Sequence, residues 1–254
     1  MKNLNGDSKY EAIIKLIDYY APTIANIPKE KIEQFKRRYL SDKRSFDEIE
    51  REMISIIQKI NMMENLVNSD IDQDVLSNSV ILIGPMGSGK STIANLLCRK
   101  YNMPHVSLDS KEQLSMLYQQ RDKFSDFKEF EFFLTGTVLT SIREPMIIDF
   151  GAGHSIYENE AMFLEMKSLL SKFSNVVLLM PSEDKEESIA ILNERKGIKS
   201  RSSEDYDNRH FINMPCNYEL ANITEYTKDK LPEQITDEII KQVSQNQMES
   251  AKVI

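Results

Sequence analysis

Residues 80–94 read VILIGPMGSGKSTIA, and this stretch decides the fold. It begins within the apolar run SVILIG, residues 79–84, which is typical of a strand buried on both faces of a sheet. The segment 84–91 then fits the pattern G-x-x-x-x-G-K-[ST], and TIANLL, residues 92–97, suits the first turns of a helix. The stretch therefore predicts a strand, a phosphate-binding loop and a helix in direct succession.

The glycine loop predicts a binding site for the phosphates of a nucleotide. Free backbone N–H groups converge where the helix begins, and the helix adds partial positive charge there. Gly87 and Gly89 let the backbone wrap closely around a phosphate. Lys90 can reach the β- and γ-phosphates of ATP, and the Ser91 hydroxyl can ligate Mg²⁺. The residues expected to bind the nucleotide are Gly84, Met86, Gly87, Ser88, Gly89, Lys90, Ser91 and Thr92.

Short apolar runs continue beyond the loop and alternate with stretches of helical character. These runs are HVSLD (105–109), PMIIDF (145–150), NVVLLM (175–180) and NITEYT (222–227). Such an alternation predicts parallel strands joined by helical crossovers. We therefore expect a three-layer α/β domain over residues 79–254.

Residues 1–66 predict helices only, forming a small N-terminal domain. Ser45 and Glu48 make a capping box, and apolar residues at helical spacing follow as far as Ile60. Because three short helices bury little surface, we expect this unit to pack against the rest of the chain. Residues 67–78 are polar and without periodicity, which is typical of a linker.

The composition argues against several classes of function. The chain has 254 residues, a net charge of −8 and no strongly basic block, so we expect no general affinity for nucleic acid or for an anionic membrane. Cys98 and Cys216 make neither a disulfide framework nor a metal-binding spacing. No stretch approaches the ~18 apolar residues of a membrane helix, and the N-terminus lacks the apolar run of a signal peptide. We expect a cytoplasmic monomer or homodimer.

Two carboxylates stand at the ends of predicted strands, where ligands of open α/β sheets bind. Asp109 ends its run and could orient an acceptor hydroxyl or accept its proton. Alternatively, Asp109 caps a helix in SKEQLSML, residues 110–117. Asp149 ends the strand run PMIID, as a Walker B carboxylate does, and could hold Mg²⁺ directly or through water.

A second glycine turn follows Asp149 at once. In FGAGH, residues 150–154, Gly151 and Gly153 permit a tight turn and a close approach of the backbone to an acceptor. The alternative is a turn that binds nothing. His154 could serve as a base, but a lone histidine at such a turn more often caps a helix or fills the core.

The polar segment 193–211 is a candidate lid over the site. It contains Arg195, Arg201 and Arg209, any of which could stabilise charge that develops on the transferred phosphoryl group. We favour Arg195 as the catalytic arginine because the end of a helix should hold it most firmly. The alternative is a solvated loop of mixed charge.

From about residue 79 to residue 240 the chain resembles shikimate kinase and related P-loop small-molecule kinases. The likeness lies in LIGPMGSGKSTIANLL, in MPHVSLD, whose Asp109 matches an acceptor-binding aspartate, and in the turn 151–153. FKEFE, residues 127–131, is similar to the family's Phe-Arg-x-x-Glu, whose arginine holds the substrate carboxylate. ANITEYTKDKLPEQITDEII is similar to the family's last strand and helix. The resemblance implies five parallel strands in the order 2-3-1-4-5, a mobile lid, and acceptor binding by Asp109, Lys128, Gly151 and Gly153.

Three departures from the family pattern bear on the acceptor and the metal. The family's first aspartate of the second strand is Ser107 here, which suggests that metal coordination has moved to Asp149. Lys128 replaces the family's arginine and lacks its bidentate geometry. Asn213 stands where a second substrate arginine is usual. We therefore expect an acceptor other than shikimate.

The sequence thus predicts ATP- and Mg²⁺-dependent phosphoryl transfer to a hydroxyl of a small molecule, with Lys90, Asp109 and Arg195 as catalytic residues. One alternative is a zeta-toxin-like kinase of a nucleotide sugar, gated by N-terminal helices that weakly resemble VbhA-type antitoxin domains. Unchanged activity and cell growth after deletion of residues 1–75 would argue against such gating. Another alternative is a nucleotide-dependent switch that has no small-molecule acceptor.

Overall fold

The computed structural model of this protein describes residues 71–124, 126–195 and 208–250. The expected N-terminal helices and the first part of the expected linker lie outside the described residues, as does most of the candidate lid. The chain divides into two units, one of residues 1–69 with 119–133 and one of residues 70–118 with 134–254. Each unit is described by itself below.

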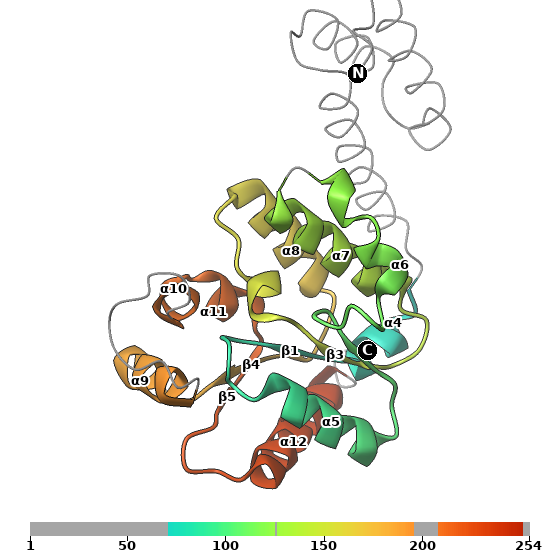
Figure 1. Cartoon of the computed structure of the whole chain (residues 1–254). Helices are drawn as coiled ribbons and strands as arrows, with labels where there is room; N and C mark the ends of the chain where they lie inside the picture. The colour runs from blue at the N-terminus through green and yellow to red at the C-terminus, as the bar shows by residue number, and fades with distance from the viewer. Residues whose placement is uncertain (1–70, 125, 196–207, 251–254) are drawn as a thin grey trace, which may run out of the picture. The chain divides into compact units, whose positions relative to one another are not determined.

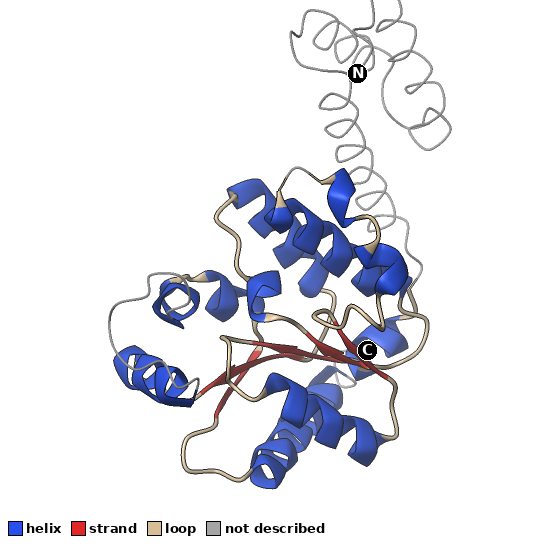
Figure 2. Ribbon diagram, in the orientation of Figure 1, coloured by secondary structure: helices blue, strands red, loops and turns tan. Residues whose placement is uncertain are grey.

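Five parallel strands form a single sheet in the larger unit (Figure 2). They are β1 (Val80–Ile83), β2 (His105–Ser107), β3 (Ile147–Asp149), β4 (Val176–Met180) and β5 (Ile223–Tyr226). Their order across the sheet is β2-β3-β1-β4-β5. All five predicted strands are thereby confirmed, and so is the order that the family resemblance implied.

Helices connect the strands and cover both faces of the sheet (Figure 1). In chain order the helices are α4 (Gln73–Asn78), α5 (Lys90–Tyr101), α6 (Ser115–Tyr118), α7 (Phe127–Ser141), α8 (Glu160–Leu170), α9 (Lys185–Arg195), α10 (Asn208–Asn213), α11 (Cys216–Leu220) and α12 (Pro232–Ser250). The described residues also form two 3₁₀ helices, η2 (Arg121–Lys123) and η3 (Ala152–Ser155). Figure 1 shows α5 and α12 on one face of the sheet and α8 with α11 on the other.

A hydrophobic core between one face of the sheet and the helices α5 and α12 holds these two helices in place. Leu82 and Val177 from the strands pack with Leu97 of α5 and Ile239 of α12, and all four side chains are fully buried. Burial of each such side chain stabilises the fold by about 1.5–3 kcal/mol. Because α5 begins at Lys90, this core fixes the position of the loop that precedes it.

A short helix lies within the segment that we expected to be an irregular linker. Residues 73–78 form α4, and the carboxylate of its N-cap residue Asp72 accepts from the backbone N–H of Asp74 at 2.9 Å. Val75 and Leu76 are buried, and the Asn175 amide donates to the carbonyl of Ser77 at 2.7 Å. This helix was not predicted because its sequence is mostly polar and only two apolar side chains, Val75 and Leu76, anchor it.

The stretch after Asp109 is a series of turns and not the helix that SKEQLSML suggested. The backbone N–H of Ser110 donates to the Ser107 carbonyl at 3.0 Å, and helix begins only at Ser115. The Gln113 side chain accepts from the Ser107 N–H at 2.9 Å and so stabilises the turn. Asp109 therefore does not cap α6, and the alternative structural role for it is wrong.

Among the described residues, no helix is long and apolar enough to cross a membrane.

Candidate active site

The glycine loop takes the shape that its motif predicted. Gly84 and Gly89 have φ values of +141° and +98°, which side-chain-bearing residues rarely adopt. A Cβ on Gly84 would lie 2.6 Å from the carbonyl oxygen of Leu179, so the loop must be glycine there to pack against β4. Gly89 is the N-cap of α5, and the space where its Cβ would project is open. The helix start thus faces free space, as a phosphate site requires.

Lys90 is folded back along the loop, and its side chain is buried. Its Nζ donates to the carbonyl oxygens of Gly84 at 2.9 Å and of Pro85 at 3.0 Å. Burial lowers the pKa of Lys90 from its ordinary value, while the carboxylates of Asp149 and Asp109 oppose that fall. The lysine is therefore within electrostatic reach of both carboxylates that the sequence analysis singled out.

Asp149 ends β3 as a buried carboxylate beside the loop. One of its oxygens, Oδ1, is buried without a hydrogen-bond partner in the described part of the chain. Burial raises the pKa of Asp149, and the nearby Ser91 hydroxyl and the charge of Lys90 oppose that rise. In the sheet, Asp149 is the direct neighbour of Ser107 on β2.

Asp109 is held at the end of β2 by its neighbours. The N–H of Leu108 donates to the Asp149 carbonyl at 2.9 Å, and the Tyr118 hydroxyl donates to the Leu108 carbonyl at 2.8 Å. A Cβ on Gly151 would lie 2.0 Å from Oδ1 of Asp109, so the glycine turn and this carboxylate are in direct contact. Although 72% of the Asp109 side chain is exposed, the surrounding protein raises its pKa by desolvation, and Lys90 opposes the rise.

Arg195, the last residue of α9, reaches the phosphate loop. Its Nη1 donates to the Gly87 carbonyl at 3.4 Å. Arg209 instead pairs with Glu186 at 2.8 Å, and Arg201 lies outside the described residues. Arg195 therefore contacts the phosphate loop from the end of α9.

The remaining predicted residues take different positions. In the loop, Gly87, Ser91 and Thr92 are exposed and Met86 is half-buried, whereas the Ser88 hydroxyl is buried without a hydrogen-bond partner among the described residues. Gly153 lies in η3, two residues after Gly151.

Lys128 and Asn213 bear on recognition of the acceptor. Lys128 lies in the first turn of α7, in the other unit, where its Nζ pairs with Glu131 at 2.5 Å. Asn213 is the last residue of α10. The role of Lys128 therefore stays a prediction from sequence.

The structure also places His154 against this site, a position that sequence reasoning underrated. The side chain is buried, and its Nε2 lies 3.8 Å from Oδ1 of Asp109. Its Nδ1 is 2.8 Å from the Thr135 hydroxyl on α7. Its position directly after the glycine turn indicated that His154 could lie near the site. The sequence does not indicate, however, that Thr135 contacts the histidine ring.

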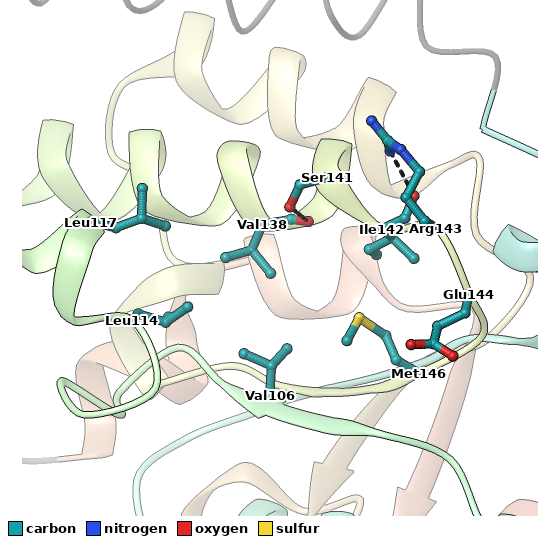
Figure 3. Close-up of a pocket in the computed structure, with 9 residues that line it drawn as sticks. All are labelled: Val106, Leu114, Leu117, Val138, Ser141, Ile142, Arg143, Glu144 and Met146. Carbon is teal, nitrogen blue, oxygen red and sulfur yellow. Dashed lines mark hydrogen bonds between the residues drawn. The ribbon is translucent and has the colours of Figure 1, made fainter.

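A cavity of about 320 Å³ elsewhere in the larger unit is a poor candidate for a phosphate site (Figure 3). It is lined by Val106, Leu114, Leu117, Val138, Ser141, Ile142, Arg143, Glu144 and Met146, which include none of the predicted site residues. The guanidinium of Arg143 turns back to the end of α7, where it donates to the carbonyl oxygens of Thr140 and Ile142. The cavity thus offers a mostly apolar wall.

The phosphate loop, the parallel sheet and the carboxylates at its edge define a P-loop small-molecule kinase, a transferase. Comparison with known proteins agrees with this class. The family model for shikimate kinase matches residues 86–244, and the chain belongs to that family.

Individual relatives show how far the likeness extends. A curated shikimate kinase of Enterococcus faecalis is 28% identical over 172 residues, which cover 66% of this chain and 99% of the relative. One of Flavobacterium psychrophilum is 24% identical over 172 residues, covering 64% of this chain and 96% of the relative. The solved structure of shikimate kinase from Acinetobacter baumannii in complex with shikimate has 16% identity and a TM-score of 0.49, covering 68% of this chain and 98% of that one.

Proposed function

We propose that this protein catalyses ATP- and Mg²⁺-dependent transfer of a phosphoryl group to a hydroxyl of a small-molecule acceptor. One observation carries the proposal: the Nζ of Lys90 lies against the carbonyl oxygens of the phosphate loop, within electrostatic reach of both Asp149 and Asp109. Ser91, the next residue of α5, places a hydroxyl at the same helix start. P-loop phosphoryl transfer uses a lysine, a hydroxyl and a carboxylate in this arrangement.

The donor side of the site fits the phosphates of ATP and a magnesium ion. The loop amides and Lys90 would hold the β- and γ-phosphates, for which Lys90 exchanges its present carbonyl partners. Ser91 and the unpartnered Oδ1 of Asp149 would hold Mg²⁺, which prefers oxygen ligands of this kind. The ion, when bound, neutralises charge on the phosphates.

The position of Asp149 supports a metal role that the family pattern places on another strand. The family's usual aspartate corresponds to Ser107, and Ser107 is the register partner of Asp149 in the neighbouring strand. A carboxylate on β3 can therefore serve the same edge of the sheet as one on β2. This relation supports the prediction that the metal ligand has moved.

The acceptor side is built around Asp109. Its exposed carboxylate would accept the proton of the acceptor hydroxyl as that oxygen forms its bond to the γ-phosphorus. The bond from the γ-phosphorus to the bridging oxygen breaks, and ADP is released. Desolvation raises the pKa of Asp109, which makes it a better proton acceptor than an ordinary aspartate.

Arg195, the glycine turn and Lys128 complete the proposed site. Arg195 would turn from the Gly87 carbonyl to the transferred group and stabilise its charge. Gly151 and Gly153 would let the acceptor approach the backbone beside Asp109. Lys128 would contact the acceptor, a role that rests on sequence alone.

We propose an acceptor other than shikimate. Recognition of a carboxylate relies on the planar fork of arginine, and this chain has Lys128 and Asn213 at the two positions where the family resemblance places arginines. Loss of a buried charge-assisted contact typically costs several kcal/mol of binding energy. A neutral polyol, sugar or nucleoside fits these two positions better.

The test is turnover of Mg²⁺-ATP by the full chain with a panel of sugars, polyols, gluconate, nucleosides, nucleotide sugars and shikimate, using Lys90→Ala as the blank. We expect one compound to stimulate ADP formation, and Lys90→Ala and Asp109→Asn to abolish that stimulation. Robust activity with shikimate would overturn the acceptor proposal alone. Tight ATP binding without stimulation by any compound would overturn the kinase proposal and favour a switch.

A further inference from the structure

His154 connects the acceptor carboxylate to the interior of the larger unit. Its side chain is 2% exposed, and it belongs to η3, which follows the glycine turn. One ring nitrogen, Nδ1, lies 2.8 Å from the Thr135 hydroxyl of α7. The other, Nε2, lies 3.8 Å from Oδ1 of Asp109. The imidazole thus stands between a buried hydroxyl and an exposed carboxylate.

We propose that His154 is a positioning residue, which holds Asp109 in the orientation that accepts the acceptor's proton. In this arrangement Thr135 donates to Nδ1, and Nε2–H donates to Oδ1 of Asp109. The inference rests on the role that the proposed function gives to Asp109. It adds that this role depends on two buried side chains, His154 and Thr135.

The surroundings favour one tautomer of the ring. A neutral imidazole carries its proton on one nitrogen, and its other nitrogen accepts. With the proton on Nδ1, the Nε2 lone pair would face the Asp109 carboxylate, and the two would repel each other. With the proton on Nε2, the ring attracts the carboxylate and accepts from Thr135 at 2.8 Å. The Asp109 carboxylate therefore favours the tautomer with the proton on Nε2, and the Thr135 hydroxyl can donate to the unprotonated Nδ1 of that tautomer.

The backbone fixes the ring, so that the carboxylate is the part that moves. The His154 N–H donates to the Gly151 carbonyl at 3.0 Å, and the Tyr157 hydroxyl donates to the His154 carbonyl at 2.6 Å. Asp109 is bounded by Gly151 but is otherwise exposed. A small rotation of its side chain closes the gap from 3.8 Å to a hydrogen bond.

Holding one oxygen of Asp109 leaves the other for chemistry. Lys90 also attracts this carboxylate. A bond from His154 to Oδ1 would anchor the side chain and leave Oδ2 to receive the proton. His154 itself does not touch the acceptor in this account.

The first experiment determines the tautomer by ¹⁵N NMR of the imidazole rings in the full chain. The chain has 3 histidines, so a His154→Gln spectrum identifies the His154 signals. We expect a protonated Nε2 and an unprotonated, hydrogen-bonded Nδ1. Thr135→Val should shift the Nδ1 signal, and Asp109→Asn should shift the Nε2 signal. A proton on Nδ1, or an Nε2 signal that ignores Asp109→Asn, would overturn the inference whether or not turnover is found.

The second experiment separates positioning from packing with two amide variants. A glutamine can place its amide nitrogen near the position of Nε2, whereas an asparagine reaches only the position of Nδ1. With the compound of the panel that is phosphorylated, we expect His154→Asn to lower kcat roughly 10- to 100-fold, with the KM for ATP unchanged. His154→Gln should restore most of that loss. Equal losses in both variants would assign His154 a packing role and refute positioning.

Discussion

Substitution of Gly151 by alanine tests the geometry of the acceptor site through a single methyl group. The backbone of Gly151 has φ −61° and ψ 154°, which alanine adopts freely, so the change introduces no backbone strain. The new Cβ would lie 2.0 Å from Oδ1 and 2.5 Å from Cγ of Asp109. Normal contact is about 3.5 Å, and the carboxylate oxygen must therefore move by roughly 1.5 Å.

The fold should tolerate this movement, whereas activity should not. Because 72% of the Asp109 side chain is exposed, it can rotate away at a cost on the order of 0.5–1.5 kcal/mol. That cost corresponds to a fall in Tm of at most about 6 °C for a domain of this size. A displacement of about 1 Å at the reacting groups, however, can lower kcat/KM by roughly 100-fold.

The assay is a double-mutant cycle with Asp109→Ala, in which kcat/KM and Tm are measured for all four proteins. If the methyl group acts through the carboxylate, Gly151→Ala should cost nothing further once Asp109 is alanine. A second loss of similar size on the Asp109→Ala background would refute the reasoning. So would full activity of the single variant Gly151→Ala.

Three more predictions follow from the site and its surroundings. Arg195→Ala should lower kcat by roughly 10- to 1,000-fold, and Arg209→Ala, whose guanidinium pairs with Glu186 in the structure, serves as the matched control; equal losses in the two would assign the loop contact no catalytic role. Asp149→Asn should raise the Mg²⁺ concentration for half-maximal activity roughly 10-fold or more, and an unchanged metal titration would place the ion elsewhere. Burial raises the pKa of Glu225, and the hydrogen bond from Lys230 opposes that rise. Because the folded protein binds the Glu225 proton more tightly than the unfolded chain does, the contribution of Glu225 to the free energy of unfolding is complete at low pH and is lost as pH rises through the raised pKa. The Tm of Glu225→Gln relative to the wild type should therefore increase from acidic to neutral pH, and a difference that falls with pH would contradict this sign.

The strands could be predicted from the sequence because each of them lies in a short apolar run of neighbouring residues. NVVLLM, for example, contains a strand whose five residues are all buried. The order of the strands is not encoded in any run, and it was expected only through the family resemblance. Local reasoning failed where few side chains decide the structure: α4 depends on two buried apolar residues, and the turn after Asp109 depends on the side chain of Gln113.

Part of the site could also be predicted, because some of its residues belong to local sequence patterns. The loop motif and the strand-end carboxylates are local, and the structure brings Lys90, Asp109 and Asp149 into mutual electrostatic reach. The contacts of His154 are not local, since one partner comes from α7 and the other from the end of β2. No periodicity or spacing predicts such a meeting, because it depends on how helices and strands pack.

The pairing of Ser107 with Asp149 across β2 and β3 changes how relatives of this chain should be compared. An alignment column records one position of one strand, and in the column of the family's usual aspartate this chain has Ser107. The sheet places the column of Asp149 alongside it, so that a carboxylate is still present at this edge. On the proposed function, the negative charge at the metal site is a property shared by two alignment columns, and evolution can exchange residues between them while the chemistry persists. Homologues that lack the usual aspartate should be searched along the adjacent strand before they are set aside as inactive.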